Sequence, residues 1–135
     1  MFDLSWFYEW HMYLIVLGVI SNLVGVYIVK FKKGKKWRIK AHQRVTVVGS
    51  MLIIIGVGIM FLGKRSMGYD HLTSPHGLAG IFTLLLLVFS MVSSNLGLRG
   101  YPKFIKIHRK LGPLVTGLMV LVSIVGTFVF ISYLA

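Results

Sequence analysis

The chain of 135 residues contains no cysteine and only three acidic residues. The absence of cysteine excludes disulfide bonds, cysteine-ligated iron–sulfur clusters and the thioether attachment of a c-type haem. A zinc or copper site would need a third or fourth protein ligand, and few acids are present to supply or orient one. These absences narrow the kinds of cofactor site that the chain can build.

Apolar residues, in contrast, are abundant and occur in long blocks. They make up 56% of the sequence, and the mean hydropathy is +0.82. About 20 helical residues cross the hydrocarbon layer of a bilayer, and four such segments with three connections account for the whole chain. We therefore predict an all-α membrane protein, an up-down-up-down bundle of four transmembrane helices that forms a single domain over residues 1–135.

The four predicted spans cover about residues 5–31, 41–62, 74–98 and 104–134. The Ser74-Pro75 pair is typical of a helix start, and Gly100-Tyr101-Pro102 interrupts the chain between the last two spans. The first span lacks a basic leader and a small-residue cleavage site, so we expect it to be retained in the membrane.

The charged residues, which give a net charge of +12, are divided unevenly between the two predicted sides of the membrane. Of the 15 cations, eight lie between Lys30 and Arg44 and five between Arg99 and Lys110, whereas all three acids lie on the opposite side. This asymmetry predicts a multi-pass protein of the cell membrane with both termini outside and the basic loops cytoplasmic. The cations thus indicate topology and contact with lipid, not binding of nucleic acid.

Four histidines, one in each span, are the main candidate site residues. Each lies near the N-terminal end of its span, and the spans alternate in direction, so His11 and His76 fall on the outer side and His42 and His108 on the inner side. About sixteen residues of the first helix, or roughly 24 Å, separate the two levels. Facing histidines on different helices are the arrangement that bis-imidazole ligation of haem requires.

Small residues follow the histidines at steps of about seven residues, which keeps each series on one helix face. The four series are His11, Gly18 and Gly25; His42, Gly49, Gly56 and Gly63; His76, Thr83, Ser90 and Gly97; and His108, Gly112 and Gly126. We expect Gly18 and Gly49 to leave room for a flat cofactor. Ordinary small-residue packing between membrane helices stays open as the alternative.

The motifs around three of the histidines resemble the cytochrome b561 family. These motifs are His76-Gly-Leu-Ala-Gly80, His108-Arg-Lys-Leu-Gly112 and His42-Gln43, and the resemblance extends over the four spans. It implies two b-type haems, one on each side of the membrane, with the iron of the outer haem held by His11 and His76 and that of the inner haem by His42 and His108.

The sequence departs from that family in several places. The flanking helices of six-helix members are absent, and the first span has one histidine where some four-helix quinol-oxidising members have two. His71, five residues before His76, is a rival for the outer ligand or a residue of an outer exit site. A solvated loop histidine is its alternative role.

Cations next to the histidines are candidates for binding haem propionates. We expect Arg44 and Arg109 to do so, because each lies within two residues of a predicted ligand, and Lys64 and Arg65 are the cations available on the outer side.

The sequence therefore predicts a transmembrane electron-transfer cytochrome that works in the lipid bilayer. Its donor or acceptor would be a quinone, a small reductant or a partner redox subunit, so that it would act as a transmembrane oxidoreductase with partners, and a larger complex or oligomer is compatible with this role. The alternative function is a non-redox membrane anchor or assembly subunit whose histidines cap or pair structurally.

Overall fold

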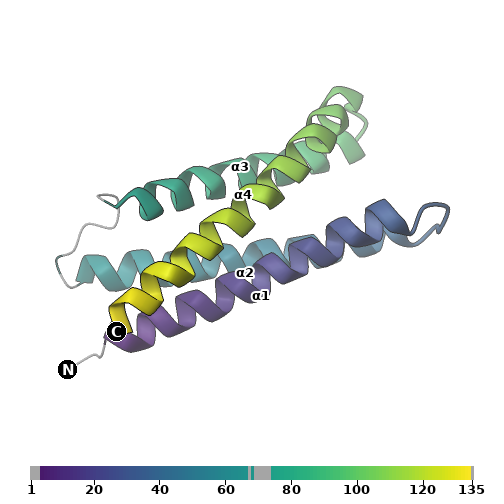
Figure 1. Ribbon diagram of the computed structural model, residues 1–135. Helices are drawn as coiled ribbons and strands as arrows, with labels where there is room; N and C mark the ends of the chain where they lie inside the picture. The colour runs from purple at the N-terminus through teal and green to yellow at the C-terminus, as the bar shows by residue number, and fades with distance from the viewer. Residues whose placement is uncertain (1–3, 67, 69–73, 135) are drawn as a thin grey trace.

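The computed structural model describes residues 4–66, 68 and 74–134, and these residues form four long helices. Their bounds are α1 Leu4–Phe31, α2 Arg38–Ser66, α3 Pro75–Leu98 and α4 Pro102–Leu134 (Figure 1). No strand occurs in this part of the chain. The predicted all-α, four-helix membrane fold is confirmed.

Three of the helices, α1, α2 and α4, extend beyond the apolar blocks that predicted them. α2 begins three residues before and ends four residues after the predicted range 41–62. The added residues include Arg38, Lys40, Lys64 and Arg65. Long basic side chains are good helix formers, and their stems can lie along apolar surface while the charged heads reach water. A helix therefore continues past the hydrocarbon layer, where hydropathy alone would end it.

Glycine shapes the two turns at the basic end of the bundle. Gly34, between α1 and α2, has a φ of 84°, and Gly100, between α3 and α4, has a φ of 103°. After α3, the N–H of Tyr101 donates to the carbonyl of Leu96, and the N–H of Gly100 donates to that of Gly97. This is a Schellman motif, in which a left-handed glycine closes the helix and reverses the chain.

The start of α3 has the predicted cap. The Ser74 hydroxyl accepts a hydrogen bond of 3.0 Å from the N–H of Gly77, and Pro75 occupies the first helical position. The serine satisfies one of the backbone donors left free at a helix start, and the proline has no donor to satisfy.

The bundle consists of two antiparallel hairpins, α1 with α2 and α3 with α4, and the helices within each hairpin pack most extensively. α1 also packs on α4 and α2 on α3, while the described parts of the diagonal helices, α1 with α3 and α2 with α4, do not pack directly on each other. The hairpins diverge toward the end that carries the α1–α2 and α3–α4 turns (Figure 1). Space between diagonal helices is therefore left for side chains or a ligand.

A small apolar cluster closes the middle of the bundle. Its buried members come from all four helices and are Val19, Ile53, Leu87, Val115 and Met119. Because this cluster spans the bundle, it separates the end that has the two basic turns, α1–α2 and α3–α4, from the end that has the α2–α3 connection. The two predicted histidine levels thus lie on opposite sides of an apolar partition.

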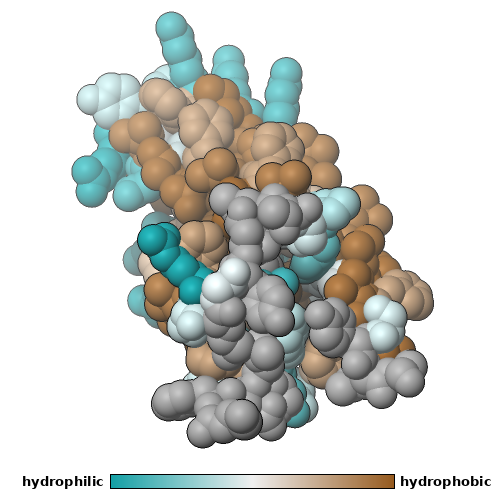
Figure 2. All heavy atoms as spheres, turned by 90° about the vertical axis from the view of Figure 1, so that its left-hand side faces the viewer, coloured by the Kyte–Doolittle hydropathy of each residue, from teal (hydrophilic) through white to brown (hydrophobic). Residues whose placement is uncertain are grey.

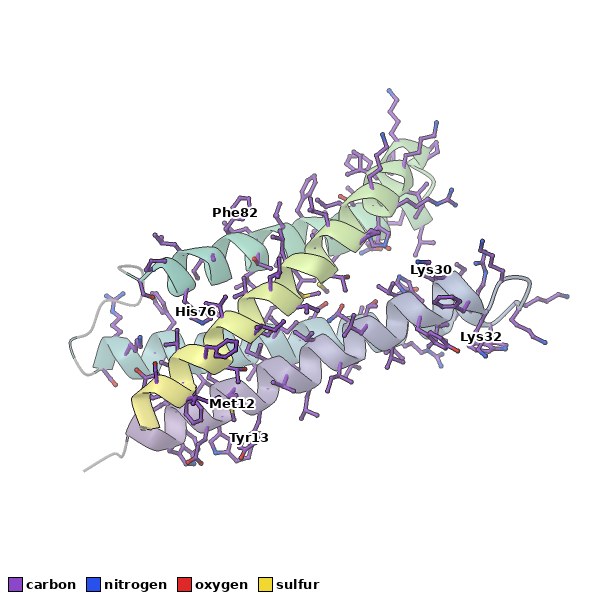
Figure 3. All side chains as sticks on the ribbon, in the orientation of Figure 1. Met12, Tyr13, Lys30, Lys32, His76 and Phe82 are labelled. Atoms are coloured by element: carbon purple, nitrogen blue, oxygen red, sulfur yellow. The ribbon has the colours of Figure 1, made fainter. Side chains whose placement is uncertain are left out.

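The outer surface of the bundle is apolar. All four helices are long and apolar enough to span a membrane, and side chains such as Tyr13 and Phe82 project outward from the bundle (Figure 3). Seen from one end, hydrophobic residues cover much of the visible flank, and hydrophilic side chains gather at the far upper end, near the α3–α4 turn (Figure 2). The chain is a multi-pass membrane protein in contact with the lipid bilayer.

Candidate functional site

In the hairpin of α1 and α2, each helix carries a histidine whose ring is hydrogen-bonded to a backbone carbonyl of the other helix. The Nδ1 of His11 donates to the carbonyl of Gly56 over 3.0 Å, and the Nδ1 of His42 donates to the carbonyl of Gly25 over 2.8 Å. A carbonyl can only accept, so in both rings the proton is on Nδ1. The Nε2 of each ring is then unprotonated and suited to bind a metal.

Gly18 and Gly49 lie between these two hydrogen bonds and face each other. A Cβ atom added at either glycine would lie 2.7 Å from the carbonyl oxygen of the other. Each step of seven residues along α1 is thus matched by a step of seven back along α2. The contacts that the structure shows for Gly18 and Gly49 are those of close helix packing, and a contact with a porphyrin stays a prediction.

The alignment of α1 with α2 also gives the distance along the helix axis between the outer and inner histidine levels. On α1, the residue that His42 reaches is Gly25, fourteen residues after His11. At 1.5 Å per residue this is about 21 Å, somewhat less than the sixteen residues that the sequence suggested. The conclusion that one ligand could not bridge both levels is unchanged.

The inner histidine of the second hairpin has two acceptors on one residue. His108 Nδ1 lies 3.0 Å from the backbone oxygen of Ser90 and 3.1 Å from its Oγ. Ser90 is buried, and it is the third member of the small-residue series that begins at His76. The ring of His108 is therefore oriented by α3, its neighbour in the hairpin.

His76 differs from the other three histidines. Its Nδ1 is buried and has no hydrogen-bond partner within the described residues. Its ring lies instead against α4, where a Cβ atom added at Gly126 would be 2.7 Å from Cε1 and 3.2 Å from Nε2. Packing on a glycine, not a hydrogen bond to a carbonyl, holds this ring in place.

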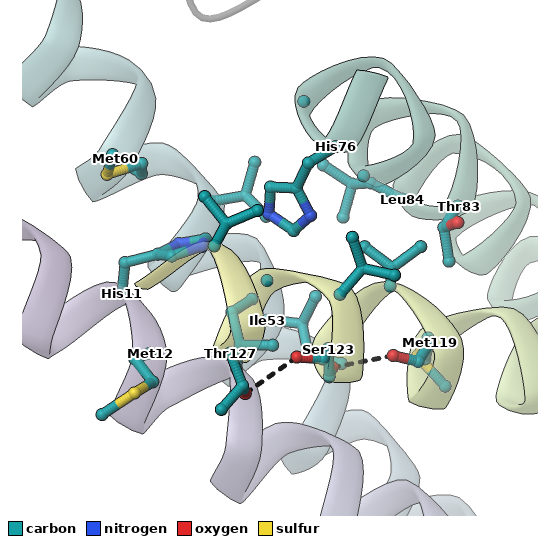
Figure 4. A pocket seen from close by; sticks show the side chains of 18 of the residues that line it. His11, Met12, Ile53, Met60, His76, Thr83, Leu84, Met119, Ser123 and Thr127 are labelled. Atoms are coloured by element: carbon teal, nitrogen blue, oxygen red, sulfur yellow. Dashed lines mark hydrogen bonds between the residues drawn. The ribbon is translucent and has the colours of Figure 1, made fainter. Parts of the chain in front are cut away.

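His11 and His76 point into one cavity of about 440 Å³ (Figure 4). Its walls are mostly apolar and come from all four helices, with Ile53, Leu84 and Met119 among the lining residues. The cavity reaches the central apolar cluster at one end and the start of α3 at the other. Two imidazoles facing an apolar space between diagonal helices fit a flat, apolar, histidine-ligated cofactor such as haem.

His42 and His108 form the second pair, across the other diagonal. Their ring centroids are 6.2 Å apart, and the ring planes are inclined by 60°. Two metal–imidazole bonds of about 2 Å each, with the radii of two rings, place such centroids about 6 Å apart. The inner pair therefore also has the spacing that a single iron between two histidines requires.

The two arginines that the sequence predicts to bind haem propionates are exposed. Arg44 and Arg109 lie on the helices that carry the inner pair, and their binding of propionates stays a prediction. Arg38, a further cation near the inner pair, donates to the carbonyl of Val29 over 3.1 Å across the α1–α2 turn. His71, the rival outer ligand, lies outside the described residues, and no group of three potential metal ligands occurs among those that are described.

Sequence reasoning missed the groups that hold the histidine rings. These groups are the carbonyls of Gly25, Gly56 and Ser90 and the open face of Gly126. The equal seven-residue steps on 11–25 and 42–56 were a usable signal, because two antiparallel helices with the same spacing can pair His with Gly at both ends. Gly126 had no such signal, since its place depends on how α4 is rotated against α3.

Most of the chain is similar to a known protein family. Residues 10–98 match the family described as eukaryotic cytochrome b561. A stretch of 71 residues is 31% identical to a mouse (Mus musculus) protein named transmembrane reductase CYB561D2, and it covers 53% of this chain and 31% of that protein. The chain thus spans about a third of the length of this curated relative. No solved structure matches.

The matched region contains three of the four histidines, His11, His42 and His76, and ends before His108. The fourth histidine is nevertheless paired with His42 in the bundle, at the spacing given above. The match covers well over half of the chain, and the chain therefore belongs to the cytochrome b561 family, whose members bind haem b and transfer electrons across membranes.

Proposed function

We propose that this protein carries electrons across the membrane through two haems b, one held by His11 and His76 and the other by His42 and His108. The observation that supports this most strongly is the pairing of histidines across both diagonals of the bundle, one pair around a cavity and the other with ring centroids 6.2 Å apart. We further propose that the four helices act as one cytochrome domain over residues 1–135.

The roles of the residues follow from their contacts. His11, His42 and His108 donate Nδ1–H to a carbonyl, which fixes the tautomer, orients the ring and makes Nε2 a better electron donor to a metal. The apolar cluster keeps water out of the space between the two levels. Bound haem supplies the one-electron chemistry, and these residues set its position and surroundings.

The electron donor and acceptor would be a quinone in the bilayer, a small reductant or oxidant, or a partner redox subunit. The name of the mouse relative, a transmembrane reductase, supports an acceptor on the far side of the membrane from the donor. We propose that both termini lie outside and the basic loops in the cytoplasm, because the turns that carry most cations, α1–α2 and α3–α4, share one end of the bundle (Figure 1).

Haem stoichiometry tests the proposal. We expect the purified full chain to give about two haems b per polypeptide in a pyridine haemochrome assay, and a redox titration to need two components. One haem per chain would reject the two-site arrangement. A colourless protein with no affinity for added haemin would instead favour the anchor or assembly role.

A further inference from the structure

The outer cavity has one charged residue among its described lining residues. That residue is Lys64, near the end of α2, and no acid lines the cavity in the described part of the chain. Most of the remaining lining is apolar. A single cation at an otherwise apolar cavity is a feature that the binding of two histidines to iron does not by itself explain.

Lys64 stands at the outer end of the cavity. On α2, Gly56 marks the level of His11, and Lys64 is eight residues further, or about 12 Å along the axis. Its Nζ lies 5.7 Å from the centre of the Tyr8 ring on α1, and Tyr8 and the start of α3 line the same end of the cavity. The cation is thus at the mouth, with the central apolar cluster at the opposite end.

The ammonium group forms no ion pair with a carboxylate within the described residues. Lys64 is partly buried, whereas its neighbour Arg65 is exposed and does not line the cavity. A partly desolvated ammonium is stabilised by an anion far more than a fully hydrated one. The position therefore favours a ligand that has an apolar body and carries carboxylates on the edge facing Lys64.

Haem b has an apolar body with charge on one edge, because its two propionates lie on one edge and its two vinyl groups on the opposite edge. We infer that Lys64 binds the propionate edge of the outer haem, so that the propionates face the outer end and the vinyl edge faces Val19, Ile53 and Leu87. The inference rests on the proposed function, because it takes the cavity between His11 and His76 as a haem site. It distinguishes between the two outer cations, assigning the role to Lys64 and not to Arg65.

The rate at which haem leaves the protein measures this contact. The full chain in detergent would be mixed with excess apomyoglobin, and the loss of the spectral component that depends on His11 and His76 would be followed over time. We expect Lys64→Met to lose this component about tenfold faster than the wild type. Lys64→Arg keeps the charge and should restore most of the retention, and Arg65→Met is the matched control and should behave as the wild type.

A modified cofactor separates a lost ion pair from a damaged cavity. Apoprotein would be reconstituted with haem dimethyl ester, whose propionates carry no charge. If Lys64 binds a propionate, wild type and Lys64→Met should release the ester at the same rate. Equal rates for wild type and Lys64→Met with ordinary haem would overturn the inference, as would a difference that persists with the ester. If no component depends on His11 and His76, the proposed function itself fails.

Discussion

The Nδ1 atom of His42 lies 2.8 Å from the carbonyl oxygen of Gly25, fourteen residues along α1 from His11. His11 makes the equivalent bond to Gly56, which is fourteen residues along α2 from His42. The two bonds fix the register of the hairpin at both of its histidine levels. One hairpin therefore supplies one oriented imidazole ring to each level, and the second hairpin has only to bring the partner ring opposite.

The packing of the His76 ring against Gly126 leads to a first prediction. Gly126→Ala would place a Cβ atom 2.7 Å from Cε1 of the His76 ring, so the ring must move away from α4. Because the displaced ring carries a predicted ligand, we expect this variant to lose the outer haem and to keep about half of the total haem, as measured by a pyridine haemochrome assay. Gly117→Ala, on the same helix and with open space around the added atom, is the control and should keep both haems.

A second prediction concerns Ser90, whose Oγ lies 3.1 Å from His108 Nδ1. Ser90→Ala removes this acceptor but leaves the backbone carbonyl, so the ring stays in place and its Nδ1–H is less polarised. A less polarised imidazole donates less charge to iron, which should raise the midpoint potential of the inner haem. Potentiometric titration would measure the shift, with haem content unchanged.

Ser93→Ala is the matched control for that experiment. Ser93 is also buried on α3, and its Oγ has no partner among the described residues. The same chemical change at this position should leave both potentials unaltered. A shift of similar size in both variants would mean that the effect comes from burial and not from His108.

A third prediction tests the packing of the first hairpin. A Cβ atom at Gly49 would lie 2.7 Å from the Gly18 carbonyl oxygen and 2.7 Å from Asn22 Nδ2, so Gly49→Ala must push α1 and α2 apart. Overpacking of this kind typically costs about 1–3 kcal/mol, and we expect a lower melting temperature in detergent together with weaker binding of both haems. Gly58→Ala on the same helix meets nothing within 4 Å and should melt like the wild type.

The sequence was sufficient for the helices, and the grouping of the histidines into two haem sites stays a prediction. Apolar blocks of spanning length predict helices, and the alternation of direction alone assigns His11 with His76 and His42 with His108 to two depths. The helix ends were less predictable, because residues such as Arg38 and Lys64 are polar and yet helical. Hydropathy reports the extent of the hydrocarbon layer, whereas the helix ends where its backbone bonds end.

The surroundings of each ring could not be read in the same way. Whether Gly18 touches a cofactor or another helix depends on the rotation of α1 about its axis, and a seven-residue repeat is compatible with either. The missing acceptor at His76 and the closeness of Gly126 depend on the tilt between α3 and α4. These are tertiary quantities, and no local pattern determines them.

A fourth prediction concerns topology. Lys35 lies in the α1–α2 turn at one end of the bundle, and Ser66 ends α2 at the other, and both are exposed. Because the chain has no native cysteine, single cysteines at these positions can be probed with an impermeant thiol reagent in intact cells. We expect labelling of Ser66→Cys and not of Lys35→Cys, and the opposite pattern would invert the proposed orientation.

The last prediction is that the four histidines fail in pairs. Both members of a pair would bind one iron, so the loss of either leaves that haem with a single ligand, while the other haem, about 21 Å away along the helix axis, keeps both. His11→Ala and His76→Ala should therefore remove the same spectral component, and His42→Ala and His108→Ala the other. Each variant should keep about half of the haem, measured by redox difference spectra.

The pairing has two clear ways to be wrong. If His42→Ala and His76→Ala removed the same component, the ligands would be shared between adjacent helices and not across the diagonals. His71→Ala is the remaining control, and it should retain both components. If it abolished the outer haem while His11→Ala changed nothing, His71 would replace His11 as the outer ligand. The hydrogen bond from His11 to the Gly56 carbonyl argues against that outcome, because it holds the His11 ring at the cavity that His76 faces (Figure 4).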